Sequence, residues 1–139
     1  MENSSFHLSL PCYDIKETKK FYVETLGFKA GRSASDTWID IDMAGNQLTF
    51  LKALRWRFPD KYYQFEGHVL PAFHFGVLLD KAVWAAMHVK CLNQGLCNED
   101  TMKFLEGKSG EHRSFFIEDP NDYVIEFKCF TDSASAFQR

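Results

Sequence analysis

The sequence predicts an α+β fold made of two units that share one order of elements, βαβββ. Two observations support this prediction. Each half of the 139-residue chain begins with an apolar strand pattern followed by a helix pattern that stops at a glycine, and each then closes with three extended segments. The repeat places unit 1 at about 6–54 and unit 2 at about 73–130 of a single domain spanning 1–139. We expect each helix to pack on one face of a sheet.

The first unit opens with a strand at 6–10 and a helix at 15–26. Asp14 and Glu17 fit a capping box at the start of this helix, and Gly27 suits its C-terminal end. Three extended segments follow, at 28–31, 38–42 and 47–52, with a turn at 44–46 between the last two.

The second unit repeats this order. A strand is expected at 73–79, Asp80 can cap a helix that runs to about residue 94, and Gly95 marks its end. The last three strands are expected at 101–104, 114–118 and 123–130, with a turn at 119–122. Between the units lies an aromatic linker, 55–72, which either packs over the sheet or forms a lid on a pocket.

Three short motifs place a metal-binding side chain between two large apolar ones: Phe6-His7-Leu8, Phe73-His74-Phe75 and Ile125-Glu126-Phe127. Neighbouring residues of a strand point to opposite faces, so the flanking residues are predicted to be buried beneath the helices and the three polar residues to face the other way. Two histidines and one carboxylate with open positions form the ligand set of a mononuclear non-haem Fe²⁺ site. The sequence therefore predicts a metal site at His7, His74 and Glu126.

Composition and charge exclude several classes of protein. Hydrophobic residues make up 45% of the chain, the net charge is −3, and the basic residues are scattered. No clustered positive charge indicates nucleic-acid binding, and no apolar run is long enough to span a membrane. The N-terminus lacks signal-peptide features, and the cysteines form neither a C-x-x-C pair nor a dense framework. We expect a cytoplasmic protein with four free thiols, Cys12, Cys91, Cys97 and Cys129.

Beyond the three motifs, the sequence contains further short matches to a known group of proteins: Gly31-Arg32-Ser33, Thr37-Trp38-Ile39-Asp40, Gly67-His68, Pro71, His74-Phe75-Gly76-Val77 and Glu126-Phe127-Lys128. With these motifs the chain resembles the vicinal oxygen chelate superfamily over residues 6–130. This superfamily includes glyoxalase I, extradiol dioxygenases and antibiotic-resistance proteins. The chain is most similar to a group of small predicted extradiol-type dioxygenases. The resemblance implies a curved mixed sheet around a metal cup, with the helices on the outer face.

The resemblance also implies a ligand set and three alternative functions. His7, His74 and Glu126 match the iron ligands of extradiol dioxygenases, and Gln47 stands where glyoxalases have a fourth ligand. The first alternative is an Fe²⁺-dependent dioxygenase acting on a catechol-like molecule. The second is a glyoxalase-like isomerase or lyase using Ni²⁺, Zn²⁺ or Mn²⁺, and the third is a non-catalytic antibiotic-binding protein. A small-molecule substrate and a homodimer are expected.

Catalysis also needs a proton acceptor near the metal, and His68 is our first choice, with Tyr63 or Tyr62 as a hydrogen-bond donor to the substrate. His112 is the second choice, because its sequence neighbours are typical of a solvated loop. His88 is expected on the surface of the second helix. Asp40 and Asp42 could contact substrate, with a solvated or hydrogen-bonded strand face as the alternative. Arg32 could pair with a substrate carboxylate, with an ordinary loop position as the alternative.

Overall fold

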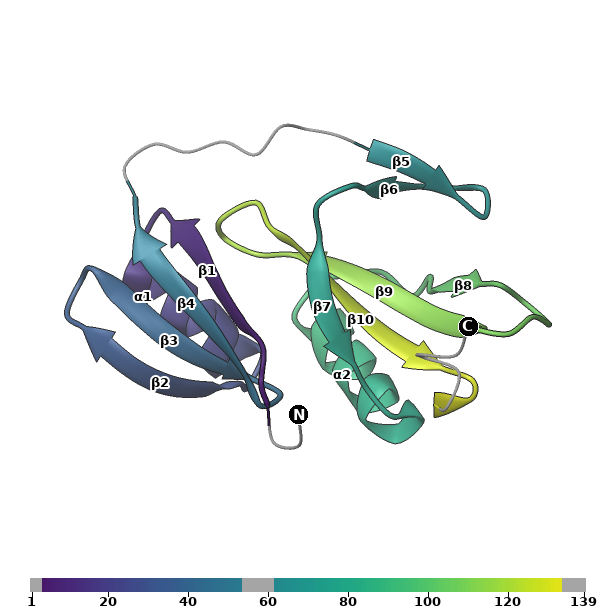
Figure 1. Cartoon of the computed structure of the whole chain (residues 1–139), viewed down its shortest axis with the longest axis horizontal. Coiled ribbons are helices and arrows are strands. Elements are labelled where there is room, and N and C mark those ends of the chain that lie inside the picture. The colour runs from purple at the N-terminus through teal and green to yellow at the C-terminus, as the bar shows by residue number, and fades with distance from the viewer. Residues whose placement is uncertain (1–3, 54–61, 134–139) are drawn as a thin grey trace. The chain divides into compact units, whose positions relative to one another are not determined.

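The structure is a computed structural model that describes residues 4–53 and 62–133 (Figure 1). The chain divides into two compact units. Unit 1 comprises Met1–Phe58 and the segment Asp119–Asp122, and unit 2 comprises Pro59–Glu118 and Tyr123–Arg139. None of the helices within the described ranges has the length and apolar content that a membrane crossing needs.

Unit 1 contains a four-stranded sheet in the order β1-β4-β3-β2, in which β1 is parallel to β4 and the other neighbours are antiparallel. Its elements are β1 His7–Cys12, α1 Ile15–Lys19, the π-helix η1 Lys20–Thr25, β2 Lys29–Ala34, β3 Trp38–Met43 and β4 Asn46–Lys52. Asp14 caps α1 by accepting hydrogen bonds from the backbone N–H groups of Lys16 and Glu17. The single helix expected at 15–26 is therefore an α-helix that continues as a π-helix.

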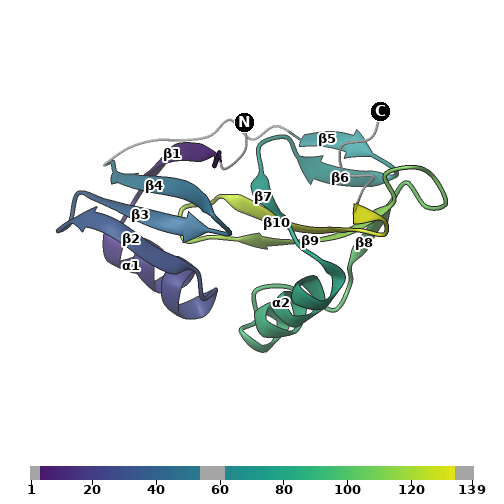
Figure 2. The ribbon, with the colours of Figure 1, turned by 60° about the horizontal axis from the view of Figure 1, so that its bottom comes forward.

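Unit 2 has the same topology, with the order β7-β10-β9-β8 and β7 parallel to β10. Its elements are β5 Tyr62–Phe65, β6 His68–Pro71, β7 Phe75–Leu78, α2 Lys81–Asn93, β8 Met102–Phe104, β9 His112–Glu118 and β10 Val124–Phe130. Two βαβββ units were predicted, and this prediction is confirmed. The described part of the aromatic linker forms the hairpin β5–β6, which lies on the opposite side of the unit 2 sheet from α2 (Figure 2).

Each sheet buries the face that its own helix covers (Figure 2). In unit 1 this layer includes Leu10, Ile41 and Phe50. In unit 2, Phe127 stacks on Phe115, and its carbonyl oxygen accepts a hydrogen bond of 2.8 Å from the Trp84 indole. All four cysteines are free, as expected.

The prediction that all six flanking residues are buried is partly wrong. Ile125 and Phe127 are fully buried, but Phe6 is 62% exposed and Phe73 is 38% exposed. Leu8 and Phe75 are half-buried. The reason is the position of the strands. β10 is an inner strand of its sheet, whereas β1 and β7 are edge strands, and Phe6 and Phe73 lie just before the first residues of these edge strands.

The turn Asp119–Asp122 contributes buried polar contacts to unit 1. The Tyr22 hydroxyl donates to the Asp119 carboxylate at 2.8 Å, and the backbone N–H of Tyr13 donates to the side-chain oxygen of Asn121 at 2.9 Å. The Asn121 amide in turn donates to the Thr18 hydroxyl at 3.1 Å. The sequence predicted the turn but not this network.

Candidate metal site

In unit 2, His74 lies directly before β7, and both of its ring nitrogens are close to acceptors. Nδ1 is 2.9 Å from the carbonyl oxygen of Pro71, and Nε2 is 3.5 Å from Oε2 of Glu126. A carbonyl oxygen can only accept, so Nδ1 carries a proton. Nε2 donates to Glu126 when the ring is protonated and carries the lone pair when the ring is neutral. The hydrogen bond with Glu126 raises the pKa of His74 above its usual value, despite partial burial, which acts in the opposite direction.

Glu126 lies in the middle of β10, and its side chain is buried on the face that α2 does not cover. The Ser114 hydroxyl donates to Oε1 at 2.6 Å, and the Lys128 ammonium is 3.2 Å from Oε2. Burial alone would raise the pKa of this carboxyl. The hydrogen bonds from His74 and Ser114, together with the charge of Lys128, outweigh burial and lower the pKa to about 2.

A glycine brings these two side chains together. Gly76 pairs with Glu126 across β7 and β10. A Cβ atom at Gly76 would be 1.8 Å from the carbonyl oxygen of Glu126, a distance that no side chain tolerates. Only glycine lets β7 approach β10 this closely. His74 is two residues before Gly76, so its side chain lies on the same sheet face as that of Glu126.

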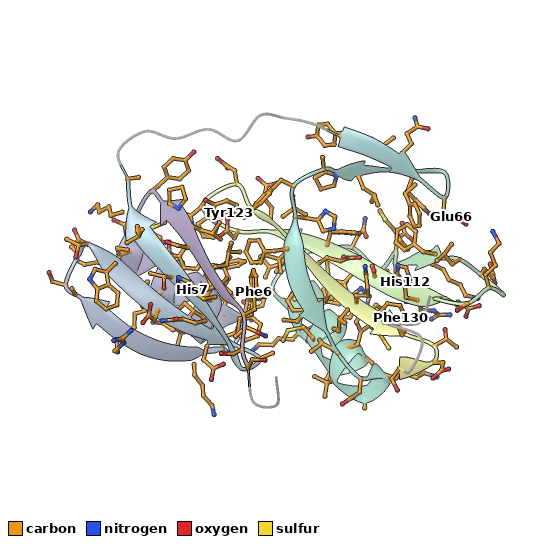
Figure 3. The ribbon with its side chains drawn as sticks, viewed as in Figure 1. Phe6, His7, Glu66, His112, Tyr123 and Phe130 are labelled. Carbon is orange, nitrogen blue, oxygen red and sulfur yellow. The ribbon has the colours of Figure 1, made fainter. Side chains whose placement is uncertain are left out.

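Unit 1 carries the remaining predicted ligands, His7 and Gln47, on one face of its sheet; His7 is labelled in Figure 3. His7 begins β1, is exposed, and pairs in register with Gln47 of β4, so both side chains are on the face opposite the buried layer. The Gln47 amide donates from Nε2 to Oδ2 of Asp40 at 3.0 Å. Its Oε1 atom therefore remains as the acceptor.

Asp40 organises this face of unit 1. It is 5% exposed, accepts a hydrogen bond of 2.6 Å from Thr49, and lies 3.4 Å from the Arg32 guanidinium. Burial would raise the pKa of Asp40, but the hydrogen bonds from Thr49 and Gln47 and the charge of Arg32 lower it overall. Arg32, Asp40 and Gln47 are among the residues that line a pocket of about 270 Å³. Asp40 thus has the hydrogen-bonded position considered in the sequence analysis, and Asp42 caps the turn by accepting from Gly45.

Each unit therefore supplies part of the predicted ligand set. Among residues 4–53 and 62–133, no three His, Cys, Asp or Glu side chains form a group that could hold a metal ion. The donors of unit 2 nevertheless suit a divalent cation. In unit 2 an ionised carboxylate and an imidazole with a fixed tautomer are both held by a second layer of hydrogen bonds, which is usual around metal ligands.

The other predicted site histidines lie among aromatic rings of unit 2. The His68 ring, in β6, contacts Phe104 edge-on at 5.3 Å. Phe104 pairs with His112, which is two residues before Ser114 on β9, so His68 lies over the sheet face that carries Glu126. Phe104, His112 and Phe130 are paired across β8, β9 and β10 and form one row of the sheet. Phe130 is four residues after Glu126 on β10, so this row lies roughly 13 Å from Glu126. The Tyr63 side chain lies outside the described residues.

Two expectations about histidines are wrong. His112 was expected in a solvated loop, but it begins β9 and is buried (Figure 3). Its ring stacks on Phe104 at 5.1 Å and makes a tilted contact with Phe130 at 5.2 Å. His88 was expected on the helix surface, but its ring stacks on Trp84 one turn earlier at 5.6 Å. In both cases the apolar faces of the imidazole favour aromatic contact.

Ser114 and Lys128 are site residues that the sequence analysis missed. The available signal was spacing: Lys128 is two residues after Glu126 on one strand, so both point to the same face. Ser114 pairs with Lys128 on the neighbouring strand, but that register is known only from the folded sheet.

Comparison with known proteins supports the fold. The sequence matches no protein-family profile, and no curated protein matches it. A glyoxalase/bleomycin resistance protein/dioxygenase from Alicyclobacillus acidocaldarius is 29% identical, with a TM-score of 0.79 over 99% of this chain and 100% of that one. The fosfomycin resistance protein FosX from Listeria monocytogenes is 14% identical, with a TM-score of 0.64 over 94% of this chain and 96% of that one. A lactoylglutathione lyase from Agrobacterium tumefaciens is 13% identical, with a TM-score of 0.63 over 91% and 92%.

The structural neighbours are thus glyoxalase/bleomycin resistance/dioxygenase proteins of the vicinal oxygen chelate superfamily, and this chain has the fold of that superfamily. The resemblance found in the sequence is confirmed at this level. The superfamily includes dioxygenases, glyoxalases and fosfomycin resistance proteins.

Proposed function

We propose that this protein is an Fe²⁺-dependent ring-cleaving dioxygenase of the extradiol type, acting on a catechol-like small molecule. One divalent metal would be held by His7 of unit 1 and by His74 and Glu126 of unit 2. The observation that carries the proposal is the His74–Glu126 pair, in which Nε2 and Oε2 are only 3.5 Å apart. Divalent iron, when bound, would supply open positions at which a chelating diol and dioxygen meet.

The side chains of the site have separate tasks in this proposal. Pro71 fixes the tautomer of His74, and Ser114 holds Oε1 of Glu126, so we assign Oε2, which lies beside His74 and Lys128, to the metal. Both ligands are oriented before a metal arrives, which reduces the ordering that binding requires. Asp40 holds Gln47 by its amide nitrogen, and we assign Gln47 to a metal-bound water rather than to the metal.

The metal assignment is tested by elemental analysis of anaerobically purified protein. The wild-type protein should contain one divalent metal per chain, and His7→Ala and His74→Ala should each abolish stoichiometric binding. His88→Ala, in which a histidine stacked on Trp84 is lost, is the matched control and should keep its metal. Full metal content in either His7→Ala or His74→Ala would show that the assignment is wrong.

The reaction is tested by oxygen uptake with a panel of catechols. Uptake that requires Fe²⁺ and is lost in Glu126→Ala supports the dioxygenase. Absence of uptake from an iron-loaded protein with any catechol contradicts it. We also propose a homodimer, which light scattering of the purified protein would test.

We assign the acid–base role to His68, with Tyr63 as a hydrogen-bond donor to the substrate. The role requires a substrate that extends from Glu126 toward the row of Phe104, roughly 13 Å farther along the strands. His68→Phe should keep its metal and lower turnover by about 10²–10⁴-fold. His88→Phe should not change turnover. Unchanged turnover in His68→Phe would remove His68 from the mechanism and make His112 the next candidate.

The glyoxalase-like alternative has one observation in its favour. Gln47 pairs with His7 across β1 and β4, and its Oε1 atom is not engaged by Asp40, so it could serve as a fourth, neutral ligand. Metal titration of Gln47→Ala distinguishes the two functions. A large loss of Ni²⁺ or Zn²⁺ affinity favours the isomerase, and an unchanged affinity favours the dioxygenase. If the wild-type protein binds no metal, the non-catalytic antibiotic-binding protein is the alternative that remains.

A further inference from the structure

Lys128 is a cation placed against a predicted metal ligand. It follows Glu126 by two residues on β10, and its side chain is three-quarters buried. Its Nζ atom is 3.2 Å from Oε2 of Glu126, the same oxygen that lies 3.5 Å from Nε2 of His74. Ser114 occupies the other oxygen at 2.6 Å. The ammonium and the imidazole therefore converge on one carboxylate oxygen.

This arrangement cannot persist unchanged when Oε2 of Glu126 ligates a divalent cation. A metal bound to that oxygen would repel the neighbouring ammonium strongly, because the site is largely shielded from water. Glu126 is the ion-pair partner that the structure gives Lys128 among the described residues. Lys128 then needs a different anion, and a ligand entering the same sheet face is the group able to provide one.

The charges of the site indicate the charge of that ligand. Within this half of the site, a divalent metal contributes +2, Glu126 contributes −1 and Lys128 contributes +1, while a ligating His74 is neutral; the sum is +2. We propose that Lys128 selects a molecule that chelates the metal through two oxygens as a dianion, with Lys128 as the counter-ion of the second charge. This inference rests on the proposed function and narrows its substrate class from catechol-like molecules to dianionic vicinal dioxygen chelates.

Oxalate and oxamate test the inference without catalysis. They have nearly the same shape and both chelate through oxygen, but oxalate carries two charges and oxamate one. Their dissociation constants are measured by calorimetry on Zn²⁺-loaded protein, with Zn²⁺ content checked after each titration. The ratio of the two constants in Lys128→Gln relative to wild type isolates the effect of Lys128, because the preference of the metal itself cancels.

We expect Lys128→Gln to lose about 10-fold or more of the preference for oxalate over oxamate. It should also bind Zn²⁺ more tightly, since no ammonium must be displaced from Glu126. Lys103→Gln is the matched control, because Lys103 is also ion-paired in unit 2, to Glu106 at 2.6 Å, on the sheet face opposite Glu126. Its preference should equal that of wild type. Lys128→Arg keeps the charge and should keep most of the preference.

The outcomes separate this inference from the proposed function. Stoichiometric Zn²⁺ with an unchanged oxalate preference in Lys128→Gln refutes the role of Lys128 and leaves the metal site intact. A wild-type protein without stoichiometric Zn²⁺ refutes both. Equal losses in Lys128→Gln and Lys103→Gln indicate a general effect of net charge and also overturn the inference.

Discussion

Replacing Gly76 with alanine tests the structural basis of the metal site. The new Cβ atom would start 1.8 Å from the carbonyl oxygen of Glu126, and real contacts of this kind are at least 3.0 Å long. The strands must therefore separate locally by about 3.0 − 1.8 = 1.2 Å. Such a shift breaks ladder hydrogen bonds, each of which contributes about 1 kcal/mol. Overpacking of this kind costs about 1–3 kcal/mol in addition.

We therefore expect Gly76→Ala to lower the free energy of unfolding by about 2–4 kcal/mol, measured by urea denaturation. Metal affinity should fall as well, because His74 precedes β7 and moves with it. Gly31→Ala is a graded control, since its Cβ would lie 3.0 Å from the Cβ of Asp40, where a small shift suffices. A Gly76→Ala variant with wild-type stability and full metal content would refute this account of the site.

Three further predictions follow from individual contacts. Ser114→Ala removes the hydrogen bond that orients Glu126, so metal affinity in a competition titration should fall about 10-fold, with little loss of fold. Asn121→Ala removes the side-chain oxygen that accepts from the backbone N–H of Tyr13 and the amide that donates to Thr18, and should cost about 2–3 kcal/mol in urea denaturation. Asn46→Ala is the control, because it loses an exposed hydrogen bond from the backbone N–H of Phe6, and it should cost less than about 1 kcal/mol. Equal losses of stability in Asn121→Ala and Asn46→Ala would contradict this prediction. Because the pKa of Glu126 is lowered to about 2, its stabilising effect on the metal-free protein is present above its usual value of 4.5 and is lost as pH falls from 4.5 toward 2. Acid unfolding of Glu126→Gln should lack that part of the pH dependence.

Local sequence signals predicted most of the elements. The helix capped by Asp80 is α2, and the apolar alternation around Glu126 corresponds to β10. These predictions succeed because caps and strand periodicity depend on near neighbours in the chain. The π-helical end of the first helix is a deviation that such signals do not detect. Its hydrogen bond from Leu26 to Phe21 depends on how the last turn packs.

Burial and histidine environments were harder to predict. Phe6 and Ile125 occupy equivalent positions in their motifs, yet one is 62% exposed and the other is fully buried. The difference depends on whether the strand is at the edge or in the interior of its sheet, which is a property of strand pairing. His112 was misjudged for the same reason, because the aromatic rings that bury it, Phe104 and Phe130, come from two other strands.

The sequence alone determined the repeated βαβββ order, the resemblance to the vicinal oxygen chelate superfamily and the residue types available as ligands. Each of these is encoded in local periodicity or in short motifs. Only the tertiary structure decided that Ser114 and Lys128 share the Glu126 carboxylate, and that Gly76 permits the close approach of β7 to β10. These features depend on strand register and on distances between segments far apart in the chain, and a single-residue change of register would turn each of these side chains to the opposite face.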